Sequence, residues 1–131
     1  MRPFILIASA TTAVALLAGC GGGAKTYEFT RTQACLKEQG QLVRPAPATD
    51  FVAANALGGA LNVKFPANQV TIAFGLDSAE ADRIANAYRR FRGRNIGIED
   101  ALSVRGNVVL LWGLTPGNEE SAGIDTCLKG P

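Results

Sequence analysis

Histidine is absent from this 131-residue chain, and its absence excludes much of the chemistry on which small enzymes depend. Without histidine there is no Ser-His-Asp or Cys-His nucleophilic site, and the usual proton carrier near neutral pH is missing. Most catalytic zinc sites also require histidine ligands. The sequence therefore gives little support to an enzyme, although hydrolysis by a pair of carboxylates stays open.

Signatures of metals, cofactors and nucleic-acid binding are also missing. The three cysteines form no Cys-x-x-Cys pair, and the chain has no Asp-x-Asp-x-Asp calcium loop. Gly21-Gly22-Gly23 is not followed by the helix lysine of a phosphate-binding loop. The formal net charge of +2 is small for a protein that binds nucleic acid. We therefore expect no metal, no cofactor and no nucleic-acid partner.

The chain also lacks an apolar run long enough to cross a membrane. After Arg2, an apolar stretch over residues 4–16 covers about thirteen positions, whereas a membrane-spanning helix needs roughly 20. A positive start followed by an apolar segment of this length is typical of an export signal. The segment ends at Leu17-Ala18-Gly19-Cys20, where small residues directly precede a cysteine.

Leu17-Ala18-Gly19-Cys20 resembles the lipobox of bacterial lipoproteins. The resemblance implies that residues 1–19 are removed as a signal peptide and that Cys20 receives a diacylglycerol. Residues 20–26 would then form a lipidated, glycine-rich tether to a single domain over residues 27–131. Because two or more acyl chains anchor a protein stably, the resemblance predicts attachment to the extracytoplasmic face of the cell membrane. The alternative is an ordinary cleaved signal in which Cys20 is incidental.

Lipidation of Cys20 would leave Cys35 and Cys127 as an even pair of cysteines. Such pairs usually oxidise outside the cytoplasm, so we predict a disulfide bond between them. This bond would close almost the whole domain, for which the chain-entropy model gives a stabilisation of about 4–5 kcal/mol. Two separate buried thiols are the alternative interpretation.

Three segments have the spacing and the end signals of helices. The first is predicted over residues 31–39, from a Thr-x-x-Gln capping box at Thr30 to Gly40. The second begins at Asp77 and the third follows Thr115. The second helix places five apolar residues on one face, namely Ala81, Ile84, Ala85, Tyr88 and Phe91. The third turns three residues inward, namely Ile124, Cys127 and Leu128.

Five short segments are expected to be strands, over residues 41–44, 61–65, 70–74, 102–105 and 108–112. Tight turns join the last four into two hairpins, the second of which turns at Gly106-Asn107. The run over 108–112 is apolar on both sides, so we expect it to be the central strand. These elements predict an α+β fold, a two-layer sandwich in which an antiparallel sheet of about four or five strands has helices on one face. A ferredoxin-like or permuted arrangement fits the same elements.

The surface feature with a functional hypothesis is a group of four arginines near the end of the second helix, Arg89, Arg90, Arg92 and Arg94. They would contact anionic lipid headgroups or a cell-wall polymer. The alternative is favourable placement at a helix C-terminus together with solvation. The acidic pairs Glu99/Asp100 and Glu119/Glu120 stand at element starts, so we expect them to serve as caps. Trp112, Tyr88 and Phe91 are expected in the core rather than on a sugar-stacking platform.

These observations predict a lipid-anchored, non-enzymatic domain that binds an envelope protein or glycan, or that scaffolds an envelope assembly. The uncovered face of the sheet or the irregular loop over residues 45–59 would be its contact surface. Phe51 is expected to hold that loop in the core. Two alternatives stay open, a small envelope hydrolase that uses paired carboxylates and an accessory lipoprotein with a purely structural role.

Overall fold

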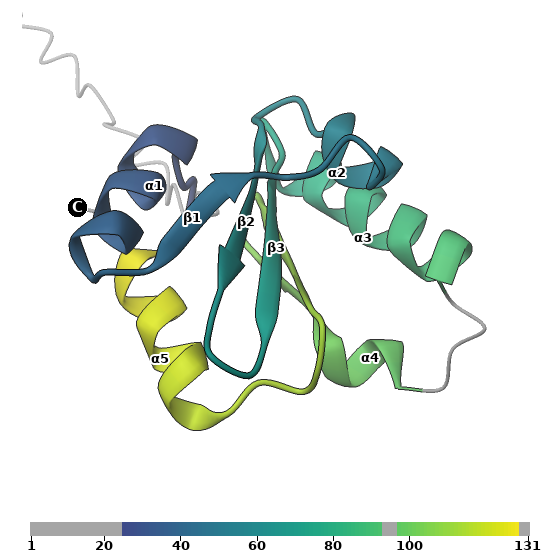
Figure 1. Ribbon diagram of the computed structural model, residues 1–131. Helices are drawn as coiled ribbons and strands as arrows, with labels where there is room; N and C mark the ends of the chain where they lie inside the picture. The colour runs from purple at the N-terminus through teal and green to yellow at the C-terminus, as the bar shows by residue number, and fades with distance from the viewer. Residues whose placement is uncertain (1–24, 93–96, 129–131) are drawn as a thin grey trace, which may run out of the picture.

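The computed structural model describes residues 25–92 and 97–128, so the lipobox, the signal peptide and most of the tether lie outside it. Five strands form one sheet, β1 (Leu42–Pro45), β2 (Ala60–Lys64), β3 (Gln69–Phe74), β4 (Leu102–Arg105) and β5 (Val108–Trp112). The helices are α1 (Phe29–Glu38), α2 (Phe51–Ala54), α3 (Ser78–Arg92), α4 (Ile98–Ala101) and α5 (Asn118–Cys127). Every strand pairing is antiparallel, in the order β1-β2-β3-β5-β4 (Figure 1). The predicted α+β class with an antiparallel sheet is confirmed.

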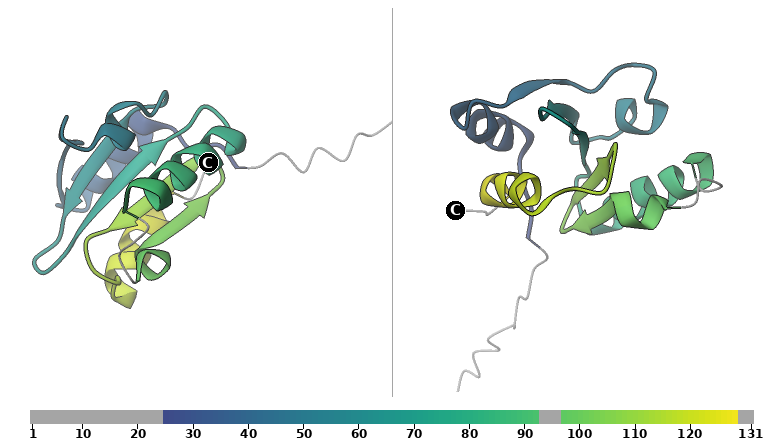
Figure 2. Two further views of the ribbon diagram at one scale, coloured as in Figure 1. Left: turned by 90° about the vertical axis from the view of Figure 1, so that its right-hand side faces the viewer. Right: turned by 60° about the horizontal axis from the view of Figure 1, so that its bottom comes forward.

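The helices are divided between the two faces of the sheet, whereas the sequence predicted them on one face. Figure 2 shows α1 and α5 together on one side, with α3 and α2 on the other. Side chains of the strands contribute to a hydrophobic core on each face of the sheet. In β3, Ile72 and Phe74 pack with α1 and α5, while Ala73 packs with α3. A strand that is apolar on both sides, as β5 is, requires cover on both faces, and this requirement accounts for the difference.

The strand order also differs from a ferredoxin-like arrangement. That pattern follows a β-α-β-β-α-β succession. Here β1, β2 and β3 pair in chain order, and only the connection from β3 through α3 to β4 passes over another strand. β5 is buried along its whole length, as predicted, but it lies beside the edge strand β4, and β3 occupies the centre.

A disulfide joins α1 and α5, which lie side by side on one face. Cys35 and Cys127 are bonded with their Cα atoms 5.5 Å apart, across a sequence separation of 92. Leu36 and Ile124 are fully buried beneath the bond, and they pack with the core residues of the sheet. The predicted pairing is confirmed, and so is the inward direction of the apolar face of α5.

The ends of α1 match the sequence pattern only in part. The helix begins at Phe29, so Thr30 lies inside its first turn and caps nothing. Its C-terminal end is a Schellman motif, in which Gly40 has a φ of +79° and Gln41 N–H donates to the carbonyl of Leu36 at 3.0 Å. The predicted helix end at Gly40 is confirmed, because glycine is the residue that a left-handed cap favours.

Two phenylalanines that were predicted in the core lie on the surface. Phe51 is 76% exposed and Phe91 is 79% exposed. Figure 1 and the right-hand view of Figure 2 show the end of α3, the turn to which Phe91 belongs, running out past the strands. Tyr88, one turn earlier, is buried as predicted, and Trp112 is buried in the opposite core cluster.

Candidate functional site

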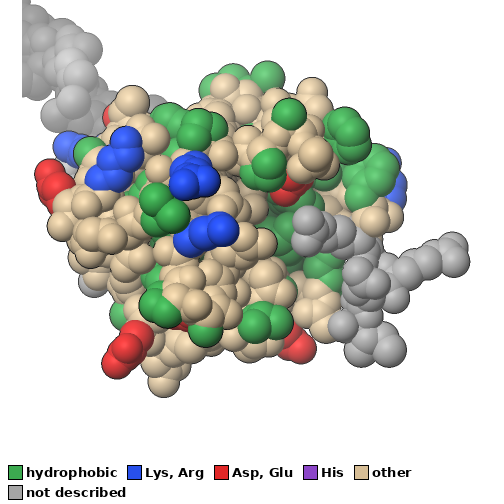
Figure 3. All heavy atoms as spheres, in the orientation of Figure 1, with side chains coloured by type: hydrophobic (Ala, Val, Ile, Leu, Met, Phe, Trp, Pro, Cys, Tyr) green, Lys and Arg blue, Asp and Glu red, His purple; other side chains and the backbone are tan. Residues whose placement is uncertain are grey.

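One part of the sheet has no helix over it. On the face that α3 covers, this helix contacts β3, β5 and β4, and the strands β1 and β2 are left open. The open strands carry polar side chains on that face, including Arg44, Asn62 and Lys64. Figure 3 shows basic side chains on this side of the molecule. The sequence predicted a whole uncovered face, but helices lie on both faces, and only the part formed by β1 and β2 is open. That part carries the basic side chains of Arg44 and Lys64.

A hollow of about 370 Å³ lies between the open strands and the loop over residues 45–59, and we call it the cationic cleft. Its lining residues are Arg44, Pro45, Pro47, Thr49, Asp50, Asn62, Lys64, Gln69 and Thr71. In the described part of the chain, neither Arg44 nor Lys64 forms an ion pair. The carboxylate of Asp50 accepts hydrogen bonds from Ala53 N–H and from the Tyr88 hydroxyl, both at 3.0 Å. Its charge is thus partly satisfied within the fold.

A second hollow of about 510 Å³ lies between α2 and α3, and we call it the apolar groove. Its lining residues are Phe51, Val52, Asn55, Leu57, Glu80, Arg83, Ile84, Ala87 and Phe91. A smaller hollow beside Asp50 and Tyr88 shares Phe51 and Phe91 with this groove. Figure 3 shows hydrophobic side chains gathered over α2 and the adjoining part of α3. The loop over residues 45–59 therefore borders both a basic and an apolar surface.

Glu80 fixes the end of that loop against the start of α3. Its side chain is buried, and its two carboxylate oxygens accept the N–H groups of Leu57 at 3.1 Å and Leu76 at 2.7 Å. Asp77 accepts the N–H of Glu80 at 2.7 Å, which is the predicted cap of this helix. As a result Leu57 and Leu76 lie close together, with 68% and 64% of their surfaces exposed.

Of the four arginines, the structure describes the side chains of Arg89 and Arg90. Arg89 Nε donates to Glu99 at 2.8 Å, and this hydrogen bond lowers the pKa of the Glu99 carboxyl and raises that of Arg89. Arg90 is exposed on α3. Arg92 is the last residue of α3, and Arg94 lies outside the described residues. Arg89 is therefore already paired with Glu99 within the protein.

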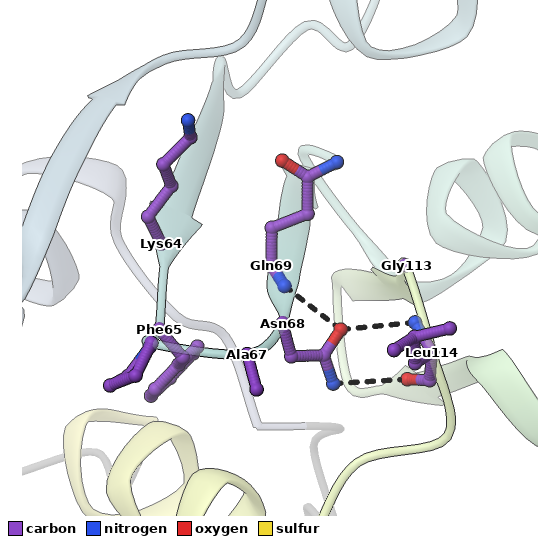
Figure 4. A pocket seen from close by; sticks show the side chains of 8 residues that line it. Lys64, Phe65, Ala67, Asn68, Gln69, Gly113 and Leu114 are labelled. Carbon is purple, nitrogen blue, oxygen red and sulfur yellow. Dashed lines mark hydrogen bonds between the residues drawn. The ribbon is translucent and has the colours of Figure 1, made fainter.

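The second acidic pair also has a structural task. Glu120 accepts the N–H of Gly117 at 3.0 Å and so caps α5, as expected. It also accepts from Asn68, whose side chain makes the further bonds to Gln69 and Leu114 drawn in Figure 4. Asn68 lies in the turn between β2 and β3, beside the hollow that Figure 4 shows. This hollow is a structural junction, because the side chain of Asn68 uses all of its donors and acceptors within the protein.

Comparisons with known proteins give no relative from which to transfer a function. No protein-family model, no curated protein and no solved structure matches the chain. Over residues 25–92 and 97–128, no three His, Cys, Asp or Glu side chains gather closely enough to hold a metal ion. In that same part of the chain, each helix is too short or too polar to cross a bilayer.

The sequence pointed to the loop and to the open sheet face, but it missed the apolar groove. The reason is that the helical spacing assigned Phe91 to the buried face of α3. A usable signal was present, since Phe91 stands between Arg90 and Arg92 at a helix end. Together with Arg89, three of the last four residues of the helix are arginines, so this turn is its most polar part.

Proposed function

We propose that this chain is a lipid-anchored extracytoplasmic protein whose domain binds an anionic glycan of the cell envelope, without catalysis. The observation that carries the proposal is the pair of basic side chains on the open sheet face. Arg44 and Lys64 lie on adjacent strands, both lining one cleft and neither forming an ion pair in the described part of the chain.

The strand register supports a polymeric ligand. Arg44 pairs with Asn62 across the β1–β2 ladder, and Lys64 follows two residues along β2 on the same face. Strand spacing puts the two basic residues about 8 Å apart at their backbones, so one extended polyanion can contact both. Arginine binds a carboxylate through two parallel hydrogen bonds, and lysine adds a point charge. The amide of Asn62 and the hydroxyl of Thr71 are suited to sugar hydroxyls.

The anchor rests on the sequence around Cys20. The lipobox-like ending of the apolar segment is the pattern on which acylation depends, and the disulfide supports an oxidising compartment. The intact mass of protein taken from the membranes of a bacterial host tests this part. We expect a chain that begins at Cys20 and carries acyl groups, whereas C20S stays unprocessed. A wild-type chain with residues 1–19 still attached, or with a bare thiol at Cys20, would contradict it.

Binding to an immobilised uronic-acid polysaccharide tests the cleft. We expect the R44E/K64E variant of the mature protein to bind this polysaccharide at least about tenfold more weakly than the wild type does. The two glutamates would repel the negatively charged polymer. The matched control is R31E/K37E, which makes the same change in charge on the exposed side of α1. An equal loss in the control would show that net charge alone drives binding, and an absence of binding by the wild type would refute the ligand class.

A further inference from the structure

We infer that the exposed apolar side chains beside α3 lie on the anionic bilayer that holds the anchor, as a second membrane contact. This inference rests on the proposed lipidation of Cys20. The contact surface, which we call the apolar edge, consists of Leu57, Leu76, Phe51, Phe91 and the basic residue Arg83. The apolar groove and the cationic cleft have no lining residue in common.

The tether enters the domain beside the end of β3. Asn107 is buried, and its side chain accepts the N–H of Tyr27 at 2.6 Å. The same side chain donates to the carbonyl of Tyr27 at 3.0 Å and to that of Gly75 at 2.8 Å. The start of the described chain is therefore held at the end of β3. Leu76 directly follows Gly75, so an exposed leucine lies at the end of the domain where the tether begins.

The segment that joins Cys20 to the described domain is short. Cys20 and Lys25 are separated by five residue steps. An extended chain covers at most about 3.6 Å per residue, so the acylated cysteine lies within about 18 Å of Lys25. A domain on so short a tether stays at the bilayer, and the end that holds Tyr27 is the nearest part of it.

The surface that begins at that end of the domain is apolar and includes a basic residue. Leu57 and Leu76 are joined through Glu80, and from Leu57 the apolar groove follows α3 toward Phe91. Apolar and aromatic side chains on one surface, with basic residues among them, suit the boundary between headgroups and acyl chains. Arg83 lines the groove and forms no ion pair within the described residues, so its charge is available to an anionic headgroup.

Spin labels on the mature, lipidated protein test the inference directly. Acylation occupies Cys20 and the disulfide occupies the other two cysteines, so an introduced cysteine is the only free thiol. We would label L57C and L76C, with L114C as the matched control. Leu114 is also 64% exposed, but it lies at the opposite end of β3, beside Asn68.

The measurement is the collision rate of each label with oxygen, which enters the bilayer, and with a water-soluble nickel chelate. In vesicles of phosphatidylglycerol and phosphatidylcholine, we expect the labels at 57 and 76 to be at least about threefold less accessible to nickel than the label at 114, and more accessible to oxygen. The variant R83E should reduce this difference in the anionic vesicles, without releasing the protein from them.

The outcomes separate the two proposals. If the protein does not float with the vesicles and carries no acyl groups, the anchor fails and the second contact fails with it. If it floats but the three labels are equally accessible to nickel, the anchor stands and the inference is overturned. Protection of Leu57 and Leu76 positions from both nickel and oxygen would also overturn it, because a protein or glycan would then cover the edge.

Discussion

Asn107 joins three parts of the chain through one buried side chain. It connects Tyr27 at the start of the described domain to Gly75 after β3, and its own carbonyl accepts the N–H of Gly75 at 2.7 Å. Asn107 and Gly75 are buried and Tyr27 is half-buried, so these groups depend on partners within the protein. Asn107 therefore holds the first segment of the domain to the sheet.

We expect N107A to lower the free energy of unfolding by about 2–4 kcal/mol, because it leaves the N–H of Tyr27 and two carbonyls without their partner. Urea unfolding followed by the fluorescence of Trp112, the single tryptophan, measures the change. The control is N86A on the exposed side of α3, which should stay within about 0.5 kcal/mol of the wild type. Equal effects in the two variants would contradict this role.

The same residue shows what a sequence pattern can and cannot predict. Gly106-Asn107 between two apolar runs predicted a tight turn, and Gly106 has the expected positive φ of +57°. The bond from Asn107 to Tyr27 spans 80 positions in the sequence. Local patterns contain no information about such a partner, so the link that positions the tether was not predictable from them.

At the scale of elements, the loop over residues 45–59 depends on its attachment to α3. The sequence predicted the start of that helix from Asp77 and Glu80, because acidic residues suit the positive end of a helix. It did not predict that Glu80 is buried and bonded to Leu57 and Leu76. A capping pattern states where a helix begins, whereas burial depends on which other segment folds against it.

We expect E80A to destabilise the protein by about 2–3 kcal/mol, since two backbone N–H groups lose their acceptor. It should also loosen the loop, which hydrogen exchange at the amides of Leu57 and Leu76 would report as faster exchange. The matched control is D82N, which removes a negative charge from an exposed position on the same helix. If D82N has the same effect, the charge near the helix start is responsible rather than the two hydrogen bonds.

At the scale of the whole molecule, two separate cores lie on the two faces of one sheet. The sequence identified the strands and the three longer helices, because apolar periodicity is a local property. The prediction that all helices lie on one face was wrong. Which face a helix covers depends on which side of each strand is left uncovered, and this is not a local property of the helix. The alternation in β2 was the available clue, since its polar residues Asn62 and Lys64 lie on the part of the sheet that no helix covers.

The disulfide joins helices on only one of these faces, yet we expect its loss to affect the whole domain. A bond across 92 residues restricts almost the entire unfolded chain, so C35S/C127S should lower the free energy of unfolding by about 4 kcal/mol. Because both cores share β3 and β5, unfolding should stay a single transition at a lower urea concentration. A reducing agent should bring the wild type to the same midpoint and leave the variant unchanged. A wild-type midpoint that is insensitive to reduction would contradict a constraining bond, and two separate transitions in the variant would show that the cores fold independently.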